Sequence, residues 1–251
     1  MTEMWRRVVD AATGSRTSGR PTSSNGASSL HLHWLEAPAA IEASVEVEVI
    51  EPPAVPALYF WAMQASFGPN GGGAHLGLQW NPRHAGSTAV NWGGYEPRGR
   101  ILEGTPSPIA STVQDPNTRT WPWVPHRRYR LRIHRGSRPG WWAGEVADLE
   151  TGAATHVREL GGGGDHLERL MVWSEVFAAC DDPPVAVRWS RPSVMALDGH
   201  RRVPSGYRVS FQAYERGGCT NTDVRVDAQG AVQRTSTPRS TTDGATLLLR
   251  F

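Results

Sequence analysis

Short segments of alternating apolar and polar residues recur along this 251-residue chain, with turn-forming residues between them. In the clearest segment, ASVEVEVIEP, the side chains of Val45, Val47 and Val49 alternate with those of Glu46 and Glu48. Alternation with a period of two residues predicts a β-strand that buries one face. Further strands are expected at 30–36, 57–67, 74–80, 87–94, 127–135, 141–149, 168–177, 186–190, 207–215, 223–227 and 246–251. Because no long segment carries an apolar stripe of helical period, the sequence predicts an all-β, antiparallel sandwich or barrel.

The chain is expected to form a single domain. Residues 11–29, AATGSRTSGRPTSSNGASS, are small, polar and without periodicity, so they bury little apolar surface to offset their ordering entropy. We therefore predict a flexible N-terminal arm over residues 1–29 and a β-sandwich domain over residues 30–251. No internal repeat of 20–50 residues indicates a propeller or a solenoid.

The charge balance indicates which partners to expect. The chain has 26 basic and 24 acidic residues, and all the basic ones are arginines. This near balance gives no electrostatic reason to expect nucleic acid or an anionic membrane as a partner. No stretch approaches the roughly 20 apolar residues that span a membrane.

Cys180 and Cys219 are the two cysteines of the chain, too few for a disulfide framework and not arranged as a C-x-x-C pair. The start of the sequence, MTEMWRRVVDAATG, lacks the apolar run of a secretion signal. The sequence therefore favours a cytoplasmic protein with reduced cysteines, whereas a secreted protein with one bridge stays open.

The glycine cluster in FWAMQASFGPNGGGAHLGLQWNP raises the question of a phosphate-binding loop. Such a loop needs a helix N-terminus after the glycines, because the aligned N–H groups bind the anion. The residues that follow instead alternate, with Leu76, Leu78 and Trp80 on one face and His75 and Gln79 on the other. This pattern predicts a β-hairpin.

Several segments together resemble a group of bacterial β-sandwich proteins of unknown function. The resemblance covers roughly residues 30–190 and lies in YFWAMQASFGPNGGGAHLGLQWN, VNWGGY, WPWVPHRRYRLRIHR and WWAGEVADLETG. It implies a jelly roll of the concanavalin or laminarinase type, in which a concave sheet face often carries a glycan. It implies no catalytic residue, and the GPNGGG insertion in the hairpin departs from the pattern.

The predicted hairpin offers side chains suited to sugar hydroxyls. Gln64 is expected to lie near Gln79 on the face that also carries His75, where Gly77 would leave room. Amide groups at the edge of a site and a ring to stack against are what a sugar requires. The candidate stacking rings are Trp61, Trp92 and Tyr95. The alternative is an ordinary solvated sheet face.

Glu175 is the most specific candidate for a functional carboxyl, because the alternation in LMVWSEVF places it on one strand face with Met171 and Trp173. Among large apolar groups, desolvation would raise the pKa of its carboxyl and suit it to acid–base catalysis. Arg130 or Arg132 would instead keep the carboxylate ionised and structural. Glu175 and His75 are the candidate catalytic residues, and Glu175 could instead be a ligand contact in a module that binds without reacting.

Other chemistry-bearing patterns are weaker. Glu145, Asp148 and Glu150 do not reproduce the E-x-D-x-E arrangement of a laminarinase-like glycosidase, and this stretch reads as the end of a strand. RRYRLRIHR lines up Arg128, Arg130, Arg132 and His134, which would either hold an acidic ligand or pair with Glu46 and Glu48.

His31 and His33 lie on one side of a predicted strand, but no third metal ligand is identifiable. No metal and no cofactor are therefore expected.

Taken together, the sequence predicts a jelly-roll-like β-sandwich that binds a carbohydrate or a glycosylated small molecule without reacting. Two alternatives stay open. The first is an acid–base enzyme on the same fold, a glycan hydrolase, lyase or biosynthetic enzyme. The second is a protein-interaction module that uses the row of Arg128, Arg130, Arg132 and His134, which we call the arginine ladder.

Overall fold

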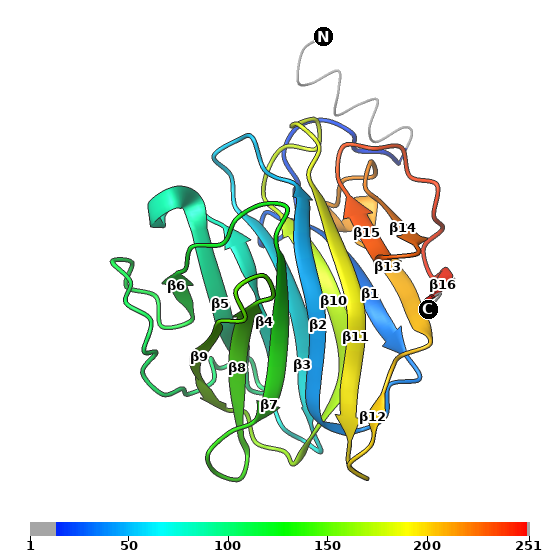
Figure 1. Ribbon diagram of the computed structural model, residues 1–251. Helices are drawn as coiled ribbons and strands as arrows, with labels where there is room; N and C mark the ends of the chain where they lie inside the picture. The colour runs from blue at the N-terminus through cyan, green and yellow to red at the C-terminus, as the bar shows by residue number, and fades with distance from the viewer. Residues whose placement is uncertain (1–13, 250–251) are drawn as a thin grey trace.

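A computed structural model describes residues 14–249, which form a β-sandwich of two layers (Figure 1). The first layer, sheet I, has the strand order β14-β15-β11-β2-β7-β8-β9, with the short β12 beside β11. The second layer, sheet II, has the order β16-β13-β1-β10-β3-β4-β5-β6. All pairings are antiparallel, and one pairing between β10 and β2, Leu167 with Ala40, connects the layers. The predicted all-β sandwich is confirmed.

The strands of sheet I are β2 (Ala40–Glu51), β7 (Arg128–Arg135), β8 (Trp141–Asp148), β9 (Ala154–Gly161), β11 (Ala186–Ala196), β12 (Arg201–Arg202), β14 (Asp223–Asp227) and β15 (Gly230–Arg234). Those of sheet II are β1 (Ser28–Leu35), β3 (Tyr59–Gly68), β4 (Gly73–Trp80), β5 (Thr88–Tyr95), β6 (Thr118–Thr120), β10 (His166–Val176), β13 (Gly206–Phe211) and β16 (Thr246–Leu248). Two single-turn 3₁₀ helices, η1 (Ala85–Ser87) and η2 (Tyr214–Arg216), lie in loops. The sequence did not predict β6, β9, β12 and β15, whose residues alternate poorly or are too few to show a pattern.

The hydrophobic core lies between the two sheets and follows the alternation of the strands. Val45, Val47 and Val49 point inward from β2, as predicted, and Leu76 and Leu78 do so from β4. The largest fully buried side chains are four tryptophans at positions 61, 92, 142 and 189. Trp34 and Trp123 are buried in the same core, so at least six of the 11 tryptophans of the chain lie there.

The outer face of sheet I, which points away from the core, carries the arginine ladder of β7 beside the glutamates of β2. Arg130 pairs in register with Glu46, and Arg128 with Glu48. The Glu46 carboxylate is 2% exposed and lies 3.3 Å from Arg128 and 3.7 Å from Arg130. The interpretation of this ladder as a structural ion-pair face is thus confirmed.

The glycine cluster connects β3 to β4 and forms a hairpin, as predicted. The backbone N–H of Gly71 donates to the carbonyl of Phe67, and that of Gly72 donates to Gly162. A Cβ added at either glycine would overlap with neighbouring backbone oxygens. The glycines therefore serve close backbone packing rather than anion binding.

The expected N-terminal arm differs from the structure where the structure describes it. Residues 14–27 are tied by hydrogen bonds to the loops around Cys180 and Cys219, and Ser28 and Ser29 already belong to β1. These fixed partners argue against flexibility for this part, while residues 1–13 lie outside the described residues.

The two cysteines form a disulfide with a Cα–Cα distance of 5.6 Å, so the expectation of reduced thiols is wrong. Disulfides are typical of proteins that fold in oxidising compartments, which removes one support for a cytoplasmic location. Among residues 14–249, no helix is long and apolar enough to cross a membrane.

Candidate functional site: the outer face of sheet II

The second outward-facing surface of the sandwich has a different composition. We define the outer face of sheet II by the side chains of β1, β10, β3 and β4 that point away from the core: Ser29, His31, His33, Met171, Trp173, Glu175, Phe60, Ala62, Gln64, His75, Gly77 and Gln79. Strand register places four of them, Ser29, Glu175, Phe60 and Gln79, side by side in one row. The predicted faces of β4 and β10 are therefore correct.

Glu175 is half-buried in this row, and its contacts within residues 14–249 are with neutral groups. Its Oε1 atom accepts hydrogen bonds from the Ser29 hydroxyl and from the Asn25 amide, both at 3.4 Å. No ion pair involves Glu175 among the described residues, and Arg130 and Arg132 lie on sheet I beside other glutamates. Burial raises the pKa of Glu175, and the hydrogen bonds from Ser29 and Asn25 offset only part of that increase.

An aromatic cluster adjoins Glu175. The ring of Phe60 meets Trp173 edge-on at 4.8 Å between centroids, and His75 meets Trp173 at 5.5 Å. The indole N–H of Trp173 donates to Oε1 of Gln64 at 3.0 Å. Phe60 is 6% exposed and Trp173 is 4% exposed, although both point away from the main core. This packing supplies the low-polarity surroundings that disfavour a charged carboxylate.

The histidines of this face are neutral at physiological pH. Burial lowers the pKa of His75 to about 4, and burial together with the nearby His33 lowers the pKa of His31 to about 4. The rings of His31 and His33 are stacked with centroids 6.2 Å apart. Within the described part of the chain, no group of three or more His, Cys, Asp or Glu residues could hold a metal ion.

Gln79 places an amide at the other end of the row. Its Oε1 accepts a hydrogen bond from the Asn81 amide at 2.9 Å, whereas its amide nitrogen donates none to any described residue. The strands of Gln79 and Glu175 are separated by β3 alone, so they lie about 9 to 10 Å apart. The Phe60 side chain lies between them, and an acid–base group and a hydrogen-bond donor thus flank one aromatic ring.

An open hollow of about 700 Å³ adjoins the Glu175 end of the row. Its lining includes Thr22, Ser23, Ser24, Asn25, Ser29, His31, Ser210, Phe211, Gln212, Glu215 and Arg216. Hydroxyl and amide groups dominate this lining, and two of its residues, Asn25 and Ser29, contact Glu175. Sequence reasoning missed Asn25, Ser29 and Gln212, because their segments join β10 only through the tertiary fold.

Several predicted ligand residues lie elsewhere. Trp61 and Trp92 are 1% and 0% exposed and point into the core, so neither ring can stack on a ligand at this face. Tyr95 lies at the end of β5 and is 55% exposed. Its role in binding stays a prediction.

Gln64 and Gln79 were expected to lie near each other, but the hairpin register pairs Gln64 with His75 and Gln79 with Phe60, which places the two amides four residues apart along the strands. Gly77 leaves no room beside them, since a Cβ there would overlap with the backbone of Trp61 and Ala62. His75 lies four residues along the register from the row of Glu175, with Trp173 between them. The structure therefore does not join Glu175 and His75 as a hydrogen-bonded pair.

The carboxylates of the rejected glycosidase motif are structural. Glu145 lies 3.6 Å from Arg132 on the outer face of sheet I. Asp148 ends β8, where it accepts hydrogen bonds from the backbone of the following turn and pairs with Arg127 at 2.9 Å. These positions agree with the sequence-based conclusion that the three carboxylates do not form a glycosidase motif.

Comparisons with known proteins found similar solved structures but no related sequence. No protein-family model and no curated protein matches the sequence. A Scytalido-glutamic peptidase bound to a peptide-based transition state analogue is similar over 83% of this chain and 98% of its own, with a TM-score of 0.48 and 12% identity. SCP-B, an eqolisin peptidase in complex with the tripeptide Ala-Ile-His, has the same coverage and identity and a TM-score of 0.43. Peanut lectin is similar over 66% of this chain and 77% of its own, with a TM-score of 0.25 and 12% identity. The structural neighbours of this all-β sandwich thus include a peptidase and a lectin, and they give no argument about its activity.

Proposed function

We propose that the outer face of sheet II binds a carbohydrate or another neutral, hydroxyl-rich substrate, and that Glu175 performs acid–base chemistry on it. The observation that carries this proposal is the half-buried Glu175 carboxyl, which has a raised pKa and, among residues 14–249, forms no ion pair with a cation. Structural carboxylates on the other sheet are paired with arginines. A group with a raised pKa and no structural partner is a functional-site candidate.

Most of the surrounding side chains are neutral, which supports an uncharged substrate. His31 and His75 are uncharged near neutral pH, and hydroxyl and amide side chains make up most of the lining of the hollow, which also includes Glu215 and Arg216. Hydroxyls that both donate and accept hydrogen bonds match such groups, while the Phe60 and Trp173 rings supply the apolar surface.

The row of side chains that contains Glu175 and Gln79 suggests how a reaction would proceed. An ionised Glu175 accepts a proton from a water molecule or a substrate hydroxyl, and a protonated Glu175 donates one to a leaving group. A raised pKa makes the protonated form of Glu175 easier to reach than that of an ordinary glutamate. The free amide N–H of Gln79 would donate a hydrogen bond to an oxygen that gains negative charge above Phe60.

A second candidate is a lectin-like module that binds the same ligand without reacting. One observation favours it: among the described residues, the row of Glu175 contains no second carboxyl group, whereas glycoside hydrolysis usually uses two. The arginine ladder gives less support to a protein-interaction module, because its guanidinium groups are engaged by Glu42, Glu46 and Glu145.

The test compares the wild type with Glu175→Gln and with Glu168→Gln as a matched control. Glu168 lies on the same strand and pairs in register with Ser66, but its exposed carboxylate sits beside Arg169 and His166. Each protein is screened by thermal shift against neutral, acidic and amino sugars, because a ligand that prefers the native state stabilises it. Turnover is measured on glycosides, esters and peptides.

The enzyme proposal expects Glu175→Gln to lose turnover by about 100-fold or more while the sugar shift persists and Glu168→Gln behaves as the wild type. Saturable sugar shifts without turnover in the wild type would favour the lectin-like module. If no sugar shifts any of the three proteins, the carbohydrate proposal is wrong.

A further inference from the structure

The segment of residues 14–27, which we call the N-terminal strap, lies across two loops that are distant in sequence. On one side it contacts the loop of residues 212–222, which contains Cys219. The backbone N–H of Arg16 donates to the Thr220 hydroxyl at 3.0 Å, and the N–H of Thr220 donates to the Arg16 carbonyl at 2.7 Å. The N–H of Thr22 donates to the carbonyl of Gly217 at 3.0 Å. The strap is thus paired with this loop at two separate points.

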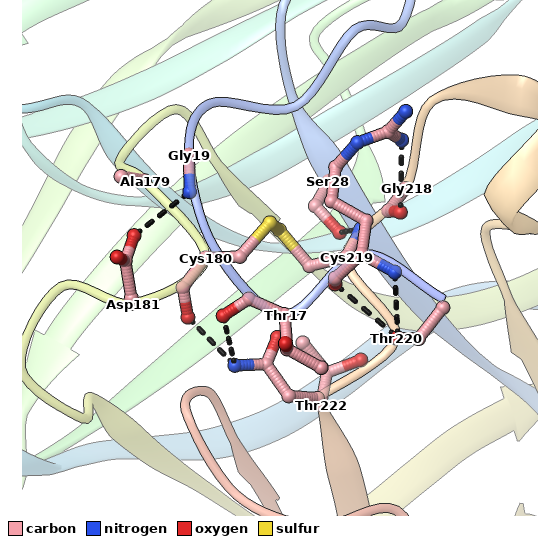
Figure 2. The surroundings of a disulfide bond; sticks show 12 residues. Thr17, Gly19, Ser28, Ala179, Cys180, Asp181, Gly218, Cys219, Thr220 and Thr222 are labelled. Carbon is pink, nitrogen blue, oxygen red and sulfur yellow. Dashed lines mark hydrogen bonds between the residues drawn. A yellow bond between two sulfur atoms is a disulfide. The ribbon is translucent and has the colours of Figure 1, made fainter. Parts of the chain in front are cut away.

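On its other side the strap contacts the loop of residues 177–185, which contains Cys180. The N–H of Cys180 donates to the Gly19 carbonyl at 2.7 Å, and the N–H of Gly19 donates to Asp181 at 2.8 Å. The Asn221 amide donates to the carbonyls of both Cys180 and Thr17 (Figure 2). The strap therefore requires both loops at once.

The disulfide holds these two loops together beneath the strap, and Figure 2 shows Thr17 and Gly19 beside it. Cys180 and Cys219 are each 4% exposed. The bond joins the loop that follows β10, the strand that carries Glu175, to the loop after β13. If the two loops separated, the strap could no longer form its hydrogen bonds to both of them at once.

The strap then continues to the Glu175 site. Residues 22–25 form one wall of the hollow, and the Asn25 amide donates to the Glu175 carboxyl at 3.4 Å. This wall covers the Glu175 carboxyl and so contributes to the burial of that group. We propose that the Cys180–Cys219 disulfide fastens the N-terminal strap over Glu175, so that the covered form of the site exists only in the oxidised chain.

Release of the strap is a two-electron reduction. A dithiol attacks one sulfur of the disulfide and then closes on itself, so the protein gains two electrons and two protons as two thiols while the dithiol becomes a cyclic disulfide. That this hollow takes a ligand rests on the proposed function, but the covering of Glu175 by the strap does not.

The first experiment follows hydrogen exchange of the Arg16, Gly19 and Thr22 amides, whose N–H groups bond to the two loops. It compares the wild type with the double variant Cys180→Ser and Cys219→Ser. We expect the three amides to exchange about tenfold faster or more in the double variant. Protected amides at Val45 and Val47 would show that the sandwich stays folded.

A second variant releases the strap without touching the disulfide. Gly217 has a φ of +85°, and a Cβ there would overlap with the backbone of Ser23 in the strap. Gly217→Ala is therefore expected to increase exchange of the same amides. The matched control is Gly199→Ala, which has a similar φ of +79° but no atom within 4 Å, and it should leave strap exchange unchanged.

The covering of Glu175 is measured by labelling carboxyl groups with a water-soluble carbodiimide and an amine, using Glu168 as an internal reference. We expect Glu175 to be labelled at least about threefold faster in the double variant and in Gly217→Ala. The proposal is overturned if the strap amides stay protected in the double variant, or if they are released while Glu175 labelling is unchanged. Neither readout needs a ligand, so failure of the proposed function would be seen separately, in the sugar screen.

Discussion

The outer faces of sheet I and sheet II each carry a glutamate that is at least partly buried, but the two glutamates have different partners. On sheet I, Glu46 is 2% exposed and lies within 4.0 Å of Arg128, Arg130 and Arg191. On sheet II, Glu175 is half-buried beside Phe60 and accepts two long hydrogen bonds from neutral groups. A paired carboxylate supports the fold, whereas an unpaired one raises the energy of its charged form. Partner charges, rather than burial alone, therefore separate the structural glutamate from the candidate functional one.

The pH dependence of the two faces should also be opposite. Burial opposes ionisation of Glu42 on sheet I, but hydrogen bonds and charges from Arg132 and Arg201 outweigh it and lower the pKa of Glu42. Its stabilising contribution is present above the ordinary glutamate pKa and is lost as the pH falls through the lowered value. Glu175 has a raised pKa, so its relative contribution is greatest at low pH and is lost as the pH rises through the raised value.

The largest expected effect is on packing at sheet II. Trp173→Ala removes a 4% exposed indole from the cluster with Phe60 and His75 and should lower the free energy of unfolding by about 3 kcal/mol. Urea denaturation in low and high salt measures it. Because the loss is apolar, a strong dependence on salt would contradict this account of the face.

Glu46→Gln should have the next largest effect, a loss of about 1 to 3 kcal/mol in the free energy of unfolding. The substitution keeps the shape of the side chain but leaves the guanidinium groups of sheet I without their shared carboxylate. The loss should shrink in 1 M salt, which screens these partly exposed arginines. A neutral result would remove the distinction between the two glutamates.

Glu175→Gln should stabilise the protein slightly at pH 7, by about 0.5 kcal/mol, because it removes a carboxylate whose charged form is disfavoured. The difference from the wild type should grow as the pH rises from below 4.5, the ordinary glutamate pKa, through the raised value. Thermal unfolding across this pH range measures it. A stability loss that grows with pH would indicate an ion pair that the structure does not show.

The smallest effect is expected for Arg191→Gln. The Arg191 side chain is 72% exposed and lies 3.8 Å from Glu46, so solvent screens the interaction. The free energy of unfolding should change by no more than about 0.5 kcal/mol. A loss as large as that of Glu46→Gln would show that Arg191, and not the β7 ladder, holds this glutamate.

Most of the strands could be predicted from the sequence, whereas the sequence left open whether Arg130 or Arg132 pairs with Glu175. Alternation places Glu175 on one strand face with Trp173. It also aligns the arginines of β7, but it left open whether they pair with Glu46 and Glu48 or hold an acidic ligand. The same rule also shows why Trp61 is in the core, since it alternates with Phe60, Ala62 and Gln64 on β3. Trp61 was predicted to stack on a ligand because it is a tryptophan, although its position in the strand indicates the core.

The rest depends on information that alternation does not contain. The register of the β3–β4 hairpin follows from the conformation of its glycine-rich turn, and this register separates Gln64 from Gln79. The ordering of residues 14–27 depends on loops that the disulfide joins across 39 positions of sequence. Asn25 and Ser29 therefore become neighbours of Glu175 only in the folded chain.

The most direct test of the central claim is a pH titration of the Glu175 side-chain carboxyl by ¹³C NMR, with Glu175→Gln used to assign the resonance. The structure predicts a midpoint above 4.5, the ordinary pKa of a glutamate. It also predicts a downward shift of this midpoint toward 4.5 when Gly217→Ala releases the strap, because solvent then reaches the carboxyl. A midpoint at or below 4.5 in the wild type would show that Glu175 is a stabilised carboxylate like those of sheet I, and would contradict the account.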